Sequence, residues 1–184
     1  TLICACEWNK QTFADIAAAT VIPYSIEFED SYDVEYYNKL NNIVGNKFTF
    51  CSVFQWGDRK GIENMLLSFF LEFYDNPNVY LILKTYVNKA MTSSDEMSYF
   101  KQQIHEIKSK ILHNGKHIEP QCKIIILNDI LSKKQVNSIY KAADVYYSCS
   151  KGEGFGLPIA EAINYKLPVV APSIGGHLDF VDAN

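Results

Sequence analysis

Between Phe48 and Ala171, short apolar segments alternate with segments whose apolar residues recur at helical spacing. Phe48–Trp56 consists mainly of apolar and aromatic residues, which indicates a strand buried on both faces. Gly61–Tyr74 follows with apolar side chains three and four residues apart, as in an amphipathic helix. This alternation predicts an α/β fold, a Rossmann-like parallel sheet with helices on both faces.

The other predicted elements follow the same rhythm. The further strands are Leu2–Cys6, Thr20–Pro23, Val79–Leu83, Lys123–Leu127, Val145–Ser148 and Pro168–Ala171. The further helices are Trp8–Ala19, a Tyr-rich segment ending near Asn42, Asp95–His113, Ser132–Ala143 with Ser132 as N-cap, and Pro158–Tyr165. Glu27–Asp33 is expected to be a loop or the entry to a helix, and Thr85–Ser94 a loop. Asn114-Gly115 is expected to cap the helix before it.

Composition narrows the class of protein. Apolar residues make up 48% of the 184 residues and charged residues 21%, which is typical of a globular chain. The net charge of −4 provides no general attraction for nucleic acid. No apolar run approaches the roughly 20 residues of a membrane span. The scattered cysteines, five in number, favour reduced thiols and a cytoplasmic location.

A glycine-rich loop follows the predicted strand Val145–Ser148. Its glycines alternate with other residues: Gly152, Gly154 and Gly156. Pro158 then opens a helix, so free backbone N–H groups and the positive end of the helix dipole meet here and suit a phosphate. Glu153 and Glu161 flank the loop, and carboxylates suit hydroxyl groups rather than phosphate. The predicted ligand therefore carries both phosphate and sugar, although a turn before an ordinary helix is the alternative.

The segment Glu153-Gly154-Phe155-Gly156-Leu157-Pro158-Ile159-Ala160-Glu161 resembles the donor-site signature of GT-B retaining glycosyltransferases of family 4 (group 1). That signature is a Glu, seven residues and a second Glu, with Gly-Phe-Gly after the first. Lys166-Leu167-Pro168-Val169-Val170-Ala171 and Gly175-Gly176 also match, while Asp179 stands where the family usually has Glu.

The resemblance covers only the C-terminal half of a two-domain GT-B enzyme. It implies that residues 1–46 are the end of the acceptor domain or a linker region. Residues 47–184 would be the nucleotide-sugar donor-binding domain, truncated at its C-terminus. We therefore expect a fragment that is inactive alone.

The resemblance also implies the site. Lys60 matches the family lysine that reaches the donor diphosphate, and Gln55 stands where a basic residue is common, so whether Arg59 substitutes stays open. Lys60 and Glu153 are the expected catalytic residues, with Glu153 on the donor sugar and Glu161 on the ribose. The expected donor-binding residues are Arg59, Gly154, Phe155, Gly156, Leu157, Glu161, Asn128 and Ile130, the last two from the turn against the nucleobase. The alternative for Arg59 and Lys60 is a pair of solvated loop residues.

Two further positions stay open. Lys84 and Thr85 could line the cleft or simply end a strand. His177 lies close to the predicted donor loop and has no assigned role.

The implied function is retaining transfer of a hexosyl unit from a nucleotide sugar to a glycan, lipid or protein acceptor. The donor is a substrate, and neither a cofactor nor a metal is expected. The expected partners are the nucleotide sugar and, through an N-terminal domain that the chain lacks, an acceptor glycan or lipid. No nucleic acid and no transmembrane segment are expected, whereas peripheral membrane contact stays open. The alternative is a nucleotide-sugar binding module without catalysis, which Gln55 and the missing acceptor half favour.

Overall fold

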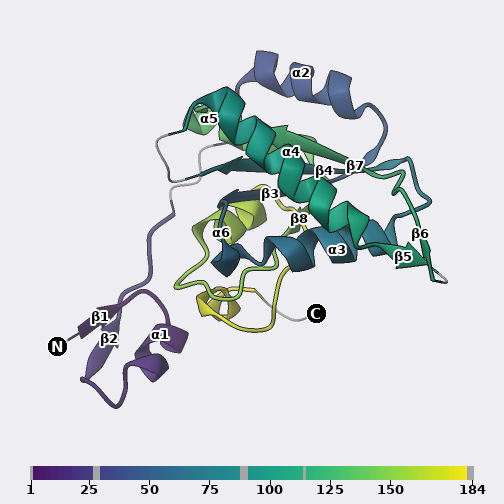
Figure 1. The fold of residues 1–184 in the computed structure, drawn as a ribbon. Coiled ribbons are helices and arrows are strands. Elements are labelled where there is room, and N and C mark those ends of the chain that lie inside the picture. The colour runs from purple at the N-terminus through teal and green to yellow at the C-terminus, as the bar shows by residue number, and fades with distance from the viewer. Residues whose placement is uncertain (1, 27–29, 88–90, 114, 182–184) are drawn as a thin grey trace.

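A computed structural model describes residues 2–26, 30–87, 91–113 and 115–181. Its main body is a parallel sheet of five strands in the order β7-β4-β3-β8-β9, flanked by helices (Figure 1). These strands are β3 (Phe48–Gln55), β4 (Val79–Tyr86), β7 (Lys123–Leu127), β8 (Val145–Tyr147) and β9 (Val169–Val170). The predicted Rossmann-like fold class is confirmed.

Helices cover both faces of this sheet. One apolar cluster joins α3 (Ile62–Glu72) and α4 (Ser93–Ser109) to the sheet, and the other joins α2 (Val34–Val44), α5 (Lys133–Ala142) and α6 (Leu157–Asn164). Alternate residues of β4 enter opposite clusters, Leu81 the first and Ile82 the second, because successive strand side chains point to opposite faces. Both are fully buried, which explains why β4 is apolar at consecutive positions.

The strand order determines where a ligand can bind. β3 is followed in sequence by β4 and β7 on one side, whereas β8 and β9 lie on its other side. The order therefore reverses between β3 and β8. In parallel α/β sheets, ligands bind beyond the carboxyl ends of the strands at such a reversal.

The N-terminal segment forms a small unit of its own beside the main sheet (Figure 1). β1 (Leu2–Cys4) pairs in parallel with β2 (Ala19–Val21), and α1 (Glu7–Thr12) connects them. A hydrogen bond ties α1 to the short 3-10 helix η2 (Gly176–Asp179): the Glu7 N–H donates to the Asp179 Oδ2 at 2.7 Å.

Some predicted boundaries are wrong. The helix predicted at Trp8–Ala19 ends at Thr12, because α1 buries no residue and so lacks the packing that stabilises short helices. Between the strand predicted at Phe48–Trp56 and the helix predicted at Gly61–Tyr74, Asp58–Lys60 forms a 3-10 helix, η1. β4 extends through Tyr86 into the predicted Thr85–Ser94 loop.

The helix predicted at Asp95–His113 begins at Ser93, where the Thr92 hydroxyl accepts the Asp95 N–H at 3.2 Å. It ends at Ser109 and is followed by the antiparallel pair β5 (Leu112–His113) and β6 (Lys116–His117). Gly115 has φ +74°, a conformation that glycine adopts at little cost and that favours a tight reversal here.

Parts of the predicted Glu27–Asp33 and Thr85–Ser94 loops, and Asn114 of the predicted cap, lie outside the described residues. Ser132 does cap α5, with Gln135 completing a capping box. Among the described helices, none has the length and apolar character needed to cross a membrane.

Candidate functional site

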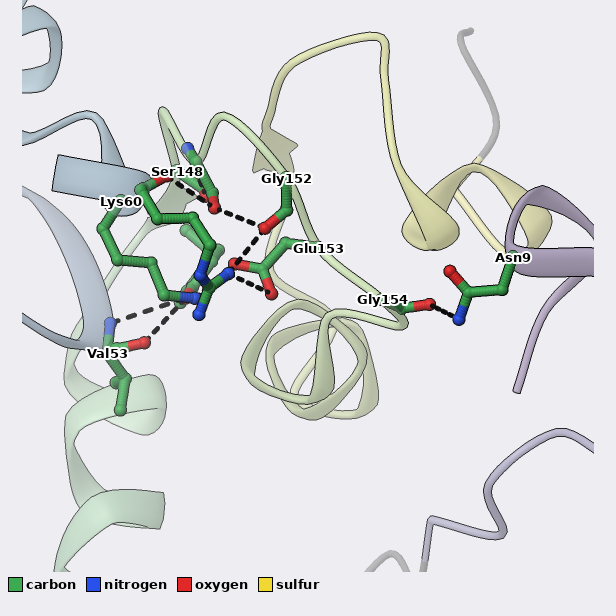
Figure 2. Close-up of polar contacts among 10 residues, drawn as sticks. Asn9, Val53, Lys60, Ser148, Gly152, Glu153 and Gly154 are labelled. Carbon is green, nitrogen blue, oxygen red and sulfur yellow. Dashed lines mark hydrogen bonds and ion pairs between the residues drawn. The ribbon is translucent and has the colours of Figure 1, made fainter. Parts of the chain in front are cut away.

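The reversal point between β3 and β8 brings two loops together. Lys60 ends η1, which follows β3, and Glu153 lies in the glycine-rich loop after β8. The Lys60 Nζ contacts the Glu153 Oε1 directly, and each side chain is only 13% exposed (Figure 2). A cavity of about 10 Å³ remains beside them, lined in part by Gly156 and Pro158, which leaves room for about one water molecule.

Arg59 reinforces the same contact from the solvent side. Its Nη1 donates to the Gly152 carbonyl at 2.5 Å and lies 3.6 Å from the Glu153 Oε2. The Arg59 carbonyl accepts the Lys151 N–H at 2.8 Å, so η1 and the glycine-rich loop are joined through backbone as well. The structure therefore brings Arg59, Lys60 and Glu153 together, with Arg59 still 61% exposed.

These neighbours control the charge of Glu153. Burial acts to raise the pKa of its carboxyl. Hydrogen bonds from Lys60 and Ser150, together with the charges of Lys60 and Arg59, outweigh burial and lower this pKa. The Glu153 carboxylate is therefore ionised at neutral pH and available as a hydrogen-bond acceptor.

Two carbonyl groups of the loop, those of Glu153 and Gly154, point away from Lys60. The Glu153 carbonyl accepts the Gly176 N–H at 2.8 Å, and the Gly154 carbonyl accepts the Asn9 side-chain amide at 3.0 Å. Figure 2 shows Asn9 reaching Gly154 from the side opposite Lys60. Because a trans peptide places its N–H opposite its C=O, the N–H groups that follow these carbonyls face the other way.

Four consecutive N–H groups of this loop have no acceptor among the described residues: Gly154, Phe155, Gly156 and Leu157. Gly156 has φ +89° and is the N-cap of α6, so these groups gather at the start of a helix. Unpaired N–H groups at a helix N-terminus form an anion-binding site. Pro158 fits there because the first turn of a helix needs no donor from it.

Glu161 lies apart from the Lys60–Glu153 pair, one turn into α6. Its Oε2 accepts the Tyr140 hydroxyl at 2.9 Å, and its Oε1 contacts the Lys133 Nζ. Burial raises the pKa of Tyr140, so this hydroxyl stays protonated and donates. The Glu161 side chain remains 25% exposed, whereas the Lys133 side chain is 52% exposed.

The turn after β7 lies near these residues but offers little from its side chains. The Asn128 Nδ2 donates to the Ser93 carbonyl at 2.8 Å and to the Ser93 Oγ at 3.1 Å, so this amide holds the start of α4. Ile130 is fully exposed. At the end of β4, burial lowers the pKa of Lys84, against the charges of Asp129 and Glu96.

His177 is buried beneath the loop. Its Nε2 donates to the Pro172 carbonyl at 2.8 Å, and the side chain is fully enclosed. A side chain added at Gly156 would begin 3.2 Å from the His177 Cβ. These contacts fit a packing role for His177.

The sequence did not single out Asn9, Lys133 or Tyr140 as residues that contact the candidate site, because each lies in another element and belongs to no motif.

A family model described as "Glycosyl transferases group 1" matches residues 35–184. The chain belongs to this family. A search of curated proteins finds no significant match. The family membership agrees with the resemblance drawn from the sequence at the level of group 1.

Several solved structures share the fold. The Anabaena protein Alr3699/HepE, solved with UDP and glucose, is 20% identical, with a TM-score of 0.69 over 98% of this chain and 46% of its own. An α,α-trehalose-phosphate synthase (UDP-forming) from Burkholderia vietnamiensis is 14% identical, with a TM-score of 0.71 over 95% of this chain and 46% of its own. The C-terminal domain of the group 1 protein LpcC from Francisella tularensis is 18% identical, with a TM-score of 0.58 over 86% of this chain and 75% of its own. The chain thus spans about half the length of the first two proteins.

Proposed function

We propose that this chain is the donor-binding half of a retaining glycosyltransferase of family 4. The observation that carries the proposal is the meeting of Lys60, Glu153 and four unpaired N–H groups where the strand order reverses. Residues 47–184 form the proposed donor domain, and residues 1–46 belong to the acceptor side or the linker. The donor is a nucleotide sugar, and a UDP-sugar is our first choice because the similar HepE structures contain UDP or UDP-glucose.

In this proposal the diphosphate replaces Glu153 as the partner of Lys60. The Lys60 ammonium and the N–H groups of Phe155, Gly156 and Leu157 then neutralise the charge that grows on the diphosphate as the bond to the sugar breaks. The electron pair of that bond leaves with the diphosphate. The acceptor hydroxyl oxygen bonds to the sugar on the same face and passes its proton to the departing diphosphate oxygen. No metal is needed for this stabilisation, because cations and N–H groups of the chain supply it.

Glu153, released from Lys60, accepts hydrogen bonds from hydroxyl groups of the transferred hexose. Glu161 accepts them from the ribose, and the exposed Lys133 moves aside to allow it. Arg59 adds a second cation at the diphosphate. The Asn128–Ile130 turn contacts the nucleobase through its backbone and through the exposed Ile130 side chain, since the Asn128 amide is already bonded to Ser93.

The acceptor, a glycan, lipid or protein, would bind the facing domain. We place the protein in the cytoplasm, since its five cysteines are free thiols. The second candidate function is a nucleotide-sugar binding module without turnover. It is favoured by Gln55, which brings no charge to a position that is often basic in the family.

Thermal shift with a panel of nucleoside diphosphates and their sugars tests the donor proposal. We expect UDP and UDP-glucose to raise the melting temperature equally with and without EDTA. In transfer assays the chain alone should give slow donor hydrolysis at most. No shift with any nucleotide contradicts donor binding, and robust glycoside formation contradicts the need for a facing domain. A longer native reading frame with an N-terminal α/β half would favour the enzyme over the binding module.

A further inference from the structure

The carbonyl group of Gly154 receives two hydrogen bonds from the N-terminal segment. The Cys6 thiol donates to it at 2.9 Å, and the Asn9 Nδ2 donates at 3.0 Å. Cys6 is fully buried, and its sulfur also accepts the Asn9 N–H at 3.3 Å, so it caps α1 while it holds the loop. Burial raises the pKa of this thiol, which keeps it protonated and able to donate.

Further contacts hold the same peptide group in place. The Phe155 ring packs between Tyr24, at a centroid distance of 5.2 Å, and Phe180, at 4.9 Å. A side chain added at Gly176 would begin 2.1 Å from the Gly154 oxygen and 2.7 Å from the Cys6 Sγ. The carbonyl oxygen therefore lies against the Gly176 backbone, and the thiol and the amide both donate to it.

Fixing this carbonyl also fixes an N–H group. The Gly154 C=O and the Phe155 N–H belong to one planar peptide, so they point in opposite directions. With the carbonyl turned toward α1, the Phe155 N–H is turned away from it and finds no acceptor among the described residues. A donor held in advance costs no reorganisation when an anion arrives.

We propose that Asn9 and Cys6 are positioning residues, which orient the Gly154–Phe155 peptide so that its N–H binds the donor diphosphate. The inference rests on the proposed function and extends it to the N-terminal unit formed by β1, α1 and β2. If the inference is right, the affinity for a diphosphate depends on the contacts that α1 and its N-cap make with the Gly154 carbonyl. Asp179 supports the arrangement, because its carboxylate accepts the Glu7 N–H and fastens α1 to η2.

Single substitutions in α1 test this role through two ligands. UDP contains the diphosphate and uridine does not, so a lost N–H contact weakens UDP alone. Asn9→Asp replaces the donating amide with a carboxylate that repels the Gly154 carbonyl, and we expect UDP affinity to fall about tenfold with uridine affinity unchanged. Cys6→Ser keeps a group that donates and accepts, and it should retain most of the affinity. Gln11→Ala, an exposed change on the same helix, is the matched control and should behave as the wild type.

The measurements are calorimetric titration with UDP and NMR titration with uridine, beside melting temperatures. If Asn9→Asp does not fold, Asn9→Ala takes its place with the same expectation of a selective loss. Equal proportional losses for UDP and uridine would overturn the inference, because a general structural role weakens both. Unchanged UDP binding in the Asn9 variants would overturn this inference and leave the donor proposal standing. A wild-type chain that does not bind UDP would overturn the donor proposal as well.

Discussion

The ammonium group of Lys60 lies against the carboxylate of Glu153, although 93 residues separate them in the sequence. Both side chains are 13% exposed, and their contact joins η1 to the glycine-rich loop. The two charges compensate each other in the absence of a ligand, which lowers the free-energy cost of burying either one. In the donor proposal, a diphosphate that enters therefore has to displace the Glu153 carboxylate from Lys60.

Removal of Lys60 should weaken diphosphate binding while leaving metal dependence unchanged. A charge-assisted hydrogen bond contributes about 1.5–3 kcal/mol, so Lys60→Ala should weaken UDP binding by roughly tenfold to a hundredfold. Calorimetric titration with and without EDTA measures both effects. Lys101→Ala, a change at an exposed lysine of α4, is the control and should bind UDP normally. Loss of wild-type binding in EDTA would contradict metal-free binding.

The sequence predicted the alternating fold and the loop because both depend on local patterns. β3 and β4 consist mainly of apolar residues, and the three glycines precede Pro158 within a few residues. The boundaries that failed depend on contacts that no local pattern contains. Trp8–Ala19 has helical spacing, yet the structure buries nothing on α1, so the helix stops at Thr12.

The residues around the candidate site were predicted unevenly for the same reason. Lys60 and Glu153 belong to motifs of a known family, whereas the contact between them depends on strand order. The partners of Glu161 and of the Gly154 carbonyl come from α5 and α1. Tyr140 and Asn9 are ordinary residues of a helix in the sequence, and only the packing of distant elements gives them partners. The assigned roles of the site residues stay predictions.

Glu153 and Glu161 should affect different parts of the donor. Glu161→Gln removes a charged acceptor from the ribose side, and it should weaken UDP and UDP-glucose alike by about 1–3 kcal/mol. Glu153→Gln should weaken UDP-glucose while UDP binds at least as tightly as in the wild type, because Lys60 loses its competing carboxylate. Calorimetry of both variants with both ligands measures the difference.

Two outcomes would contradict this separation. If Glu153→Gln weakens both ligands equally, its carboxylate only holds the loop together. If neither variant loses affinity, the Glu-x7-Glu segment is a turn before a helix. Glu106→Gln, in which an exposed carboxylate of α4 is neutralised, controls for the loss of one negative charge.

The Lys60–Glu153 contact should also make stability depend on pH. Because the folded state lowers the pKa of Glu153 below its ordinary value of 4.5, the carboxylate stabilises the fold above pH 4.5. This stabilisation is lost as the pH falls through the lowered pKa. Urea denaturation of the wild type and Glu153→Gln across that window should show their difference in unfolding free energy shrink toward acid. Glu72→Gln, which removes an exposed carboxylate of α3 outside the candidate site, is the matched control.

Gly61 and Gly57 flank η1 and should respond differently to the same substitution. Gly61 has φ +63°, and a side chain there would begin 2.1 Å from the Cys149 carbonyl oxygen. Gly57 has φ 176°, which any residue adopts, and nothing lies within 4 Å of an added side chain. Gly61→Ala should therefore cost about 1–3 kcal/mol or more in unfolding free energy, from backbone strain and the clash. Gly57→Ala should leave stability nearly unchanged.

The same pair of variants tests how η1 positions Lys60. Relief of the clash at Gly61 requires movement of either η1 or the loop that carries Cys149, and both carry groups of the candidate site. Gly61→Ala should therefore also weaken UDP binding at temperatures where the variant remains folded, whereas Gly57→Ala should bind as the wild type does. Urea denaturation and calorimetry on the same samples separate the two effects. Normal UDP affinity in a destabilised Gly61→Ala chain would mean that Lys60 reaches the diphosphate without a fixed η1.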